Sequence, residues 1–167
     1  MAKKKPQPKP PPVLGCSRVL HYAVVDKTVG FVGRTLLFVG TKELKELGRV
    51  PCLAICEDRG TGVLLFHCSR NWKTLGCSAH DSVDAARKKA EGIYPGLSTH
   101  WKAAHVTKKR ARQFLNKLWG NLRCAFCAKQ PHEVRQLFGK SGAHICDMCL
   151  EKYHGMLKKP VEAGESA

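Results

Sequence analysis

Acidic residues are scarce in this chain of 167 residues. Asp and Glu number 13 against 29 Lys and Arg, which gives a formal net charge of +16 at pH 7. Between Gly92 and His132 the chain has many Lys and Arg residues but no Asp or Glu. This imbalance favours an acidic partner, which includes nucleic acid, anionic lipid and acidic protein, and it does not choose among them.

Long hydrophobic runs are also missing. No stretch reaches the roughly 18 consecutive apolar residues that indicate a membrane span, so we expect no contact with a membrane. The segment Met1–Pro12 consists mainly of Lys, Pro and Gln, so we expect no secretory signal. The 9 cysteines are an odd number that includes two metal-type pairs, which is typical of a reducing compartment. We therefore expect a cytoplasmic protein.

Catalytic motifs are lacking as well. No paired carboxylates, open metal site or nucleophile–base pair stands out, and we expect no enzymatic activity. The triplet Gly139-Lys140-Ser141 is similar to the end of a phosphate-binding loop. That loop requires another Gly five residues earlier, where this chain has Val134, so a phosphate-binding loop is excluded.

The two Cys-x-x-Cys pairs are the strongest motif. Cys124/Cys127 and Cys146/Cys149 are separated by about 18 residues, a spacing typical of structural zinc sites. Four thiolates complete a tetrahedral shell, which suits Zn²⁺. We expect one structural zinc ion on these four cysteines. The alternative is that the pairs are two redox dithiols. That interpretation requires a strand and a helix around one of the Cys-x-x-Cys pairs, and it leaves the second pair without a role.

The residues around these cysteines carry a second signal, in the run Cys-Ala-Phe-Cys-Ala-Lys from Cys124 and in Ile-Cys-Asp-x-Cys from Ile145. From Leu122 to Leu157 the sequence resembles the N-terminal zinc-binding domain of the ClpX unfoldase. In that family the domain forms dimers and binds substrates and adaptor proteins, so the resemblance implies a homodimer that binds polypeptides. Ala128 stands where the family usually has Gly. The resemblance also implies four packing residues: Phe126, Val134, Leu137 and Ile145.

A basic segment precedes the zinc motif. The predicted helix over 107–122 has apolar residues at helical spacing, and its first turns are rich in Lys and Arg. Cations there oppose the helix dipole and cost ~0.3–1 kcal/mol each, so they indicate an anionic contact. The alternative function is nucleic-acid binding through residues 102–129, with the zinc module as scaffold. The simpler interpretation, a solvated face of a linker helix, stays open.

The remaining cysteines are Cys16, Cys52, Cys56, Cys68 and Cys77. Cys52 and Cys56 share one face of a predicted strand, and His67 precedes Cys68 on the partner strand. A second metal site or a Cys–His nucleophile is one interpretation. We favour buried thiols that serve as small core residues.

The element pattern predicts an α+β protein with five segments. They are a basic Pro-rich disordered tail (1–12), a small α+β domain (13–100), a basic linker helix (101–121), a treble-clef-like C4 zinc module (122–158) and a disordered tail (159–167). Within the small domain we expect strands at 18–25, 35–39 and 74–79, a hairpin of 50–57 with 62–69, and two helical turns at 41–47. A helix capped by Asp81 lies on the sheet, and a helix over 150–157 closes the module.

Overall fold

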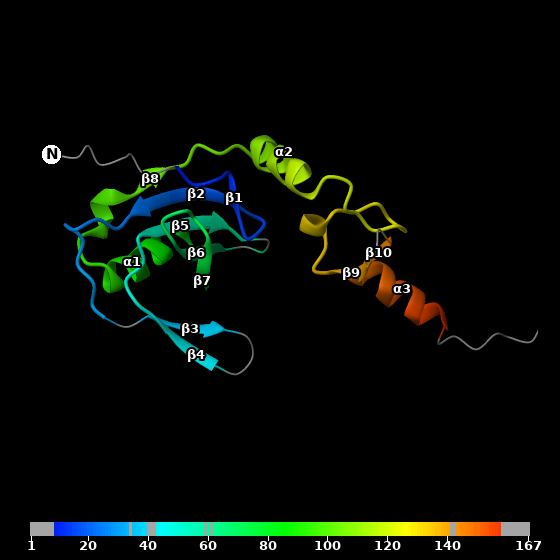
Figure 1. The fold of residues 1–167 in the computed structure, drawn as a ribbon, viewed down its shortest axis with the longest axis horizontal. Coiled ribbons are helices and arrows are strands. Elements are labelled where there is room, and N and C mark those ends of the chain that lie inside the picture. The colour runs from blue at the N-terminus through cyan, green and yellow to red at the C-terminus, as the bar shows by residue number, and fades with distance from the viewer. Residues whose placement is uncertain are drawn as a thin grey trace, which may run out of the picture. The chain divides into compact units, whose positions relative to one another are not determined.

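The computed structural model describes residues 9–33, 35–39, 43–58, 60, 62–140 and 143–157. The chain divides into two compact units between Phe114 and Leu115, inside helix α2 (Lys108–Trp119) (Figure 1). Residues 1–8 and 159–167 of the predicted tails lie outside the described residues. Strands and helices both contribute, and the predicted α+β class is confirmed.

A six-stranded antiparallel sheet organises the first unit. Its strand order is β1-β2-β5-β6-β7, and the short strand β8 pairs with β2. The predicted hairpin is confirmed, because β5 and β6 pair from Cys52↔Cys68 to Glu57↔Val63. The bounds are β1 Val13–Leu14, β2 Ser17–Val24, β5 Cys52–Glu57, β6 Val63–Cys68, β7 Thr74–His80 and β8 Lys102–Ala103.

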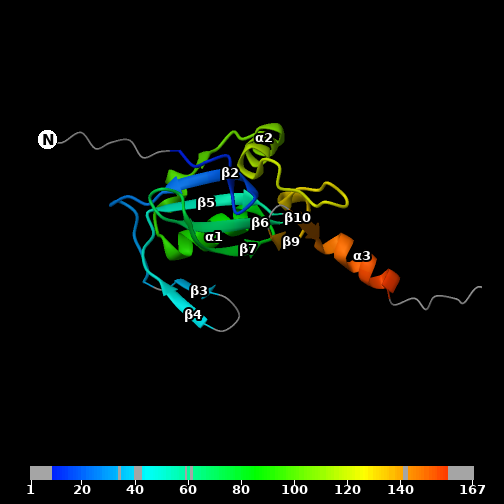
Figure 2. The same ribbon diagram turned by 45° about the vertical axis from the view of Figure 1, so that its right-hand side comes forward.

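Helix α1 (Val83–Ile93) lies across one face of this sheet, as Figure 2 shows. Ala86 and Ala90 of the helix are fully buried in one hydrophobic cluster with residues of β5 and β6. The predicted position of this helix on the sheet is therefore confirmed. The predicted cap at Asp81 is wrong by one position. Ser82 has the extended backbone of an N-cap, and its hydroxyl accepts a hydrogen bond from Ala85 N–H at 3.1 Å.

Strands β3 (Thr35–Val39) and β4 (Glu43–Leu47) form a separate two-stranded antiparallel hairpin. The prediction of helical turns over 41–47 is wrong, although residues 41–42 lie outside the described residues. The backbone of 43–47 pairs from Val39↔Glu43 to Thr35↔Leu47. A partner strand only a few residues away satisfies the backbone groups of this segment, and that pairing overrides its local helix propensity.

Polar contacts fix the start of α2 within the first unit. Arg18 on β2 donates from Nε to Glu57 at 2.9 Å and from Nη1 to the carbonyl of Val106 at 2.9 Å. Lys108 Nζ lies 3.8 Å from a carboxylate oxygen of Glu57. Because Val106 and Lys108 border the helix start, these bonds join the beginning of α2 to the ends of β2 and β5.

The second unit is built from short elements around a small core. Strands β9 (Leu137–Lys140) and β10 (Ala143–Cys146) form an antiparallel hairpin, which leads directly into helix α3 (Asp147–Leu157). A 3-10 helix, η2 (Pro131–Glu133), precedes the hairpin. The first unit has a similar one, η1 (Leu97–His100). The predicted closing helix is present and begins earlier than expected, at Asp147.

Candidate metal centre

Four cysteines converge in the second unit. Cys124 and Cys127 lie in the loop after α2, Cys146 ends β10, and Cys149 lies in the first turn of α3. Their sulfur atoms all lie within 4.8 Å of one another. Across the part of the chain that the structure describes, no other group of three or more His, Cys, Asp or Glu side chains is placed to hold a metal ion.

The sulfur spacing fits a tetrahedral zinc ion. With Zn–S bonds of about 2.3 Å, a tetrahedron places its sulfur atoms about 3.8 Å apart. Cys127 Sγ and Cys146 Sγ are separated by 3.6 Å. Four soft thiolates select zinc over hard cations such as Mg²⁺ or Ca²⁺. The group is therefore a C4 zinc site, and zinc is its structural cofactor.

Backbone N–H groups point at two of the sulfur atoms. Cys146 N–H donates to Cys124 Sγ at 3.4 Å, and Cys149 N–H donates to Cys146 Sγ at 3.4 Å. Burial alone would raise the pKa of Cys124, but backbone hydrogen bonds, chiefly from Cys146, lower it to about 6. Burial and hydrogen bonds with the other thiols raise the pKa of Cys149 to about 12. Because zinc binds the thiolate form of cysteine, a bound ion favours deprotonation of these thiols at neutral pH.

Ala128 closes the first Cys-x-x-Cys turn in a left-handed conformation, with φ 59°. Its N–H donates to the carbonyl of Cys124 at 2.9 Å, and Cys124 N–H donates to the carbonyl of Lys129 at 2.8 Å. A residue with a Cβ is strained at positive φ, whereas glycine is not. The turn therefore explains physically why glycine is usual at this position in the resembling family.

Gly139 allows the β9 and β10 backbones to approach closely. It has φ 148°, and a Cβ there would lie 2.1 Å from the carbonyl oxygen of Ala143 and 2.8 Å from Cα of His144. Gly139, the first residue of the triplet, therefore has a structural role in positioning the strand that carries Cys146. Sequence reasoning excluded a phosphate loop here without finding this role.

An ion-pair network holds the start of α3, and sequence reasoning missed it. Arg135 donates from Nε to Asp147 at 2.8 Å and from Nη2 to Glu151 at 2.6 Å. Asp147 is buried and also accepts from Gln136 N–H at 3.3 Å. The hydrogen bond from Arg135 lowers the pKa of Asp147. Asp147, which lies between Cys146 and Cys149 in the sequence, could have indicated this network, because an acidic residue in the first turn of a helix often has a defined partner.

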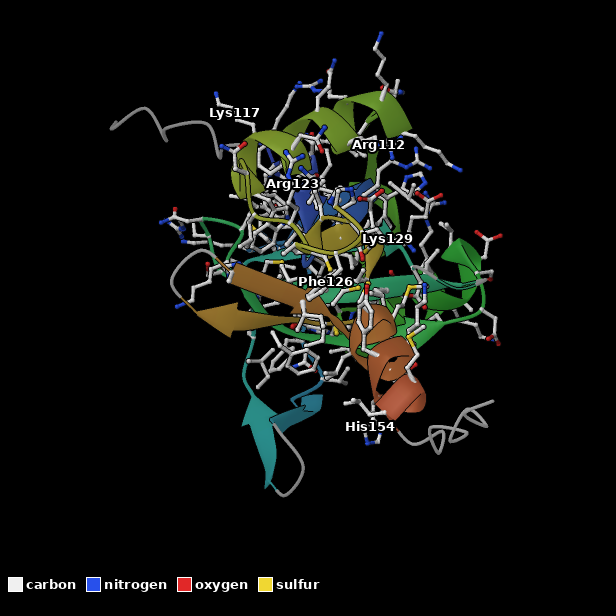
Figure 3. All side chains as sticks on the ribbon, turned by 90° about the vertical axis from the view of Figure 1, so that its right-hand side faces the viewer. Arg112, Lys117, Arg123, Phe126, Lys129 and His154 are labelled. Carbon is white, nitrogen blue, oxygen red and sulfur yellow. The ribbon has the colours of Figure 1, made fainter. Side chains whose placement is uncertain are left out.

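The module core confirms three of the four predicted packing residues. Val134 is buried with the cysteines, and Leu137 and Ile145 pack against this cluster. The prediction for Phe126 is wrong, because its side chain is 59% exposed. Its ring lies 4.9 Å from that of Tyr153 on α3 (Figure 3). Residues 125–128 of this tight turn are all exposed, so Phe126 lies at the surface of the module and not in its core.

The other cysteines do not form a site with His67. The prediction that they are buried is wrong for Cys77, which is exposed, whereas Cys16 is half-buried. Cys52, Cys56 and Cys68 are fully buried in the cluster on the sheet face opposite α1. His67 lies on the α1 face, with its ring 6.2 Å from that of Tyr94. Burial raises the pKa of Cys52 to about 11 and that of Cys68 to about 12, so both stay protonated and unreactive at neutral pH.

The second unit is thus a compact C4 zinc module in which a hairpin and the following helix each supply a ligand. The family model of the ClpX C4-type zinc finger matches residues 122–159, which contain all four cysteines. The match identifies this segment as a ClpX-type zinc finger, and residues 1–121 lie outside it. No solved structure matches the chain. None of the described helices is long and apolar enough to cross a bilayer.

Proposed function

We propose that the zinc module binds unfolded or extended polypeptides and forms a homodimer, without enzymatic activity. The observation that carries this proposal is the location of exposed apolar side chains. Of ten large hydrophobic residues that are exposed among those whose side chains the structure describes, which leaves out residues 34–46, only Val32 and Leu75 lie in the first unit. Apolar surface concentrated on one small module is typical of a protein-binding site. The others are Leu118, Phe126, Phe138, Met148, Leu150, Tyr153, Met156 and Leu157.

The exposed apolar surface of the zinc module includes a hollow. It has a volume of about 390 Å³, and its lining includes Phe126, Phe138 and Ile145. The backbone at Gly139 contributes a stretch without a side chain. A hollow of this size and apolar character suits one or two hydrophobic side chains of a client or of a second copy. Methionines such as Met148 and Met156 suit varied partners, because their side chains adapt to different shapes.

Binding of the zinc-loaded full chain to a reduced, carboxymethylated protein tests this proposal by fluorescence anisotropy. Leu150 and Leu75 are a matched pair, with exposed fractions of 45% and 42% in the second and first unit. We expect Leu150→Ser to weaken binding by roughly tenfold or more, because burying a leucine stabilises by ~1.5–3 kcal/mol. Leu75→Ser should bind as the wild type does. Equal losses in both variants would contradict a role for the module.

Nucleic-acid contact through residues 102–129 is a second candidate function. It is favoured by the exposed side of α2, which carries cations and no carboxylate. The affinity for DNA or RNA should then fall steeply with salt, since each phosphate contact releases counterions. A pull-down before and after nuclease treatment separates the two candidates, because only protein-mediated complexes survive nuclease.

The closed zinc site supports a non-enzymatic role, since four cysteine ligands leave no coordination position for water or substrate. A cytoplasmic location is also part of the proposal. It is supported by the nine cysteines, none of which is paired in a disulfide, a state that a reducing compartment preserves.

A further inference from the structure

The exposed side of α2 has an unusual composition. Within this 12-residue helix Ala111 and Leu115 are buried. A solubilising helix face normally mixes charges of both signs, often as Glu–Lys pairs four residues apart. Here every exposed polar side chain after Lys108 is a cation or an amide. These residues are Lys109, Arg110, Arg112, Gln113, Asn116 and Lys117.

The charge of this face is only weakly compensated. Lys108 lies near Glu57, but Lys109, Arg110 and Lys117 have no carboxylate within ion-pair distance among the residues that the structure describes. Two of these cations lie in the first turn, where each costs ~0.3–1 kcal/mol against the helix dipole. Thr107 offsets part of that cost, since its hydroxyl accepts from Arg110 N–H at 3.2 Å. The uncompensated cations leave a strong positive potential along α2.

Three of the exposed cations lie on two flanks of the helix. At about 100° per residue, Arg110 and Lys117 share one flank of α2, and Arg112 lies about 140–160° around the helix from them. Lys109, Gln113 and Asn116 project between the flanks. Figure 3 shows Arg112 and Lys117 on this helix. The flanking cations thus border a strip that contains Lys109 and the two amides and that extends along about two helical turns.

We infer that this face of α2 enters the major groove of double-stranded DNA. The inference rests on the second candidate function and names its nucleic acid. The major groove is about 12 Å wide and admits an α-helix, whose diameter is ~10–12 Å. Arg110 and Lys117 then contact the phosphates of one wall, and Arg112 contacts those of the other. Gln113 and Asn116 face the base edges, where amide side chains pair with adenine.

Other polyanions fit this arrangement less well. A single strand offers one row of phosphates and is bound mainly by exposed aromatic rings, whereas Trp119 of α2 is half-buried. Duplex RNA has a deep, narrow major groove that a helix does not enter. An acidic peptide offers carboxylates but not two walls at a fixed separation. The two flanks therefore favour duplex DNA.

Fluorescence anisotropy of the zinc-loaded full chain tests the inference with four probes: a labelled 24-base-pair DNA duplex, each of its separate strands, the corresponding RNA duplex, and poly-glutamate. We expect the DNA duplex to bind at least tenfold more tightly than any other probe. Arg110→Gln with Lys117→Gln should lower the log–log salt slope by about 2, at roughly 0.9 per phosphate contact. The matched control, Lys73→Gln with Lys88→Gln, removes the same charge from the first unit and should leave the slope unchanged.

Gln113→Ala with Asn116→Ala separates base contacts from charge. We expect the base preference found by selection from random duplexes to flatten, while the salt slope stays as in the wild type. Circular dichroism of each variant confirms that the helix content is retained. Equal or tighter binding of single strands or poly-glutamate, or equal losses in the lysine control, would overturn the groove inference. Absence of binding to every nucleic acid at 50 mM salt overturns the second candidate function as well.

Discussion

The sulfur atoms of Cys127 and Cys146 lie 3.6 Å apart, close to the separation of two ligands on one tetrahedral zinc ion. The two residues come from different halves of the motif, one from the loop after α2 and one from the end of β10. A metal ion that joins them also joins the loop to the hairpin. The fold of the second unit and its metal binding are therefore one process.

Removing zinc should unfold the second unit and leave the sheet of the first unit folded. The module core is small, with Val134, Leu137 and Ile145 as its main apolar contacts, and zinc supplies ~10–16 kcal/mol of apparent binding free energy in comparable peptides. Two-dimensional NMR spectra before and after chelation check this result. Cys146→Ser should lose zinc, measured by elemental analysis, whereas Cys77→Ser should retain one ion per chain. Dispersed signals from residues 122–157 after chelation would contradict the account.

Ala128→Gly should tighten zinc binding. The left-handed conformation costs an L-residue ~1–2 kcal/mol, and glycine removes this strain. Glycine also loses more chain entropy on folding, which offsets ~0.5–1 kcal/mol of the relief. We expect a two- to fivefold higher zinc affinity in a chelator competition, from a net ~0.5–1 kcal/mol. Ala125→Gly, in the same turn without positive φ, should lower the affinity instead. Similar effects of both substitutions would argue against strain at Ala128.

Gly139→Ala should destabilise the zinc module by more than ~2 kcal/mol, because the new Cβ would lie 2.1 Å from the backbone oxygen of Ala143. Gly155→Ala is the matched control. It lies within α3 with open space around its Cα, and alanine is the better helix former by ~1 kcal/mol. Zinc affinity and thermal unfolding should therefore change in opposite directions in the two variants. A loss of stability in both would show that the close approach at Gly139 is not the cause.

His67 should make the first unit less stable in acid. Burial lowers the pKa of His67 from its ordinary 6.5 to about 4. The unfolded chain therefore binds a proton below pH 6.5 that the folded chain accepts only near pH 4. The free energy of unfolding should then fall as the pH drops through this window, by up to ~3 kcal/mol.

Denaturant unfolding followed by tryptophan fluorescence at pH 7.5 and pH 5 measures this effect. His67→Leu should remove most of the pH dependence, because the protonatable group is gone. The control His105→Asn replaces an exposed histidine at φ 52° with a residue that tolerates this conformation. It should keep the wild-type dependence. If the free energy of unfolding of His67→Leu depended on pH as steeply as that of the wild type, other titratable groups would be the cause.

The sequence predicted what depends on spacing and local periodicity. The two Cys-x-x-Cys pairs predicted the zinc site, because the spacing of metal ligands along the chain follows from the geometry of the turns that hold them. The β5–β6 hairpin and the position of helix α1 on the sheet followed from their residue patterns.

Features that depend on contacts between distant segments could not be predicted in the same way. The strand at 43–47 forms because β3 is available as a partner, and its own residues favour a helix at least as well. The network of Arg135 with Asp147 and Glu151 needs the β9–β10 hairpin to bring the segment before β9 next to α3. The exposure of Phe126 depends on the direction of a tight turn, which the resemblance to a family does not specify.

Native mass spectrometry of the zinc-loaded chain tests the proposed role of the module most directly. We expect a dimer that carries two zinc ions, one for each chain, and that dissociates on chelation. Leu150→Ser should shift the population to monomers with zinc still bound, while Leu75→Ser should not. A wild-type chain that holds one zinc ion and remains a monomer at micromolar concentrations would contradict the account.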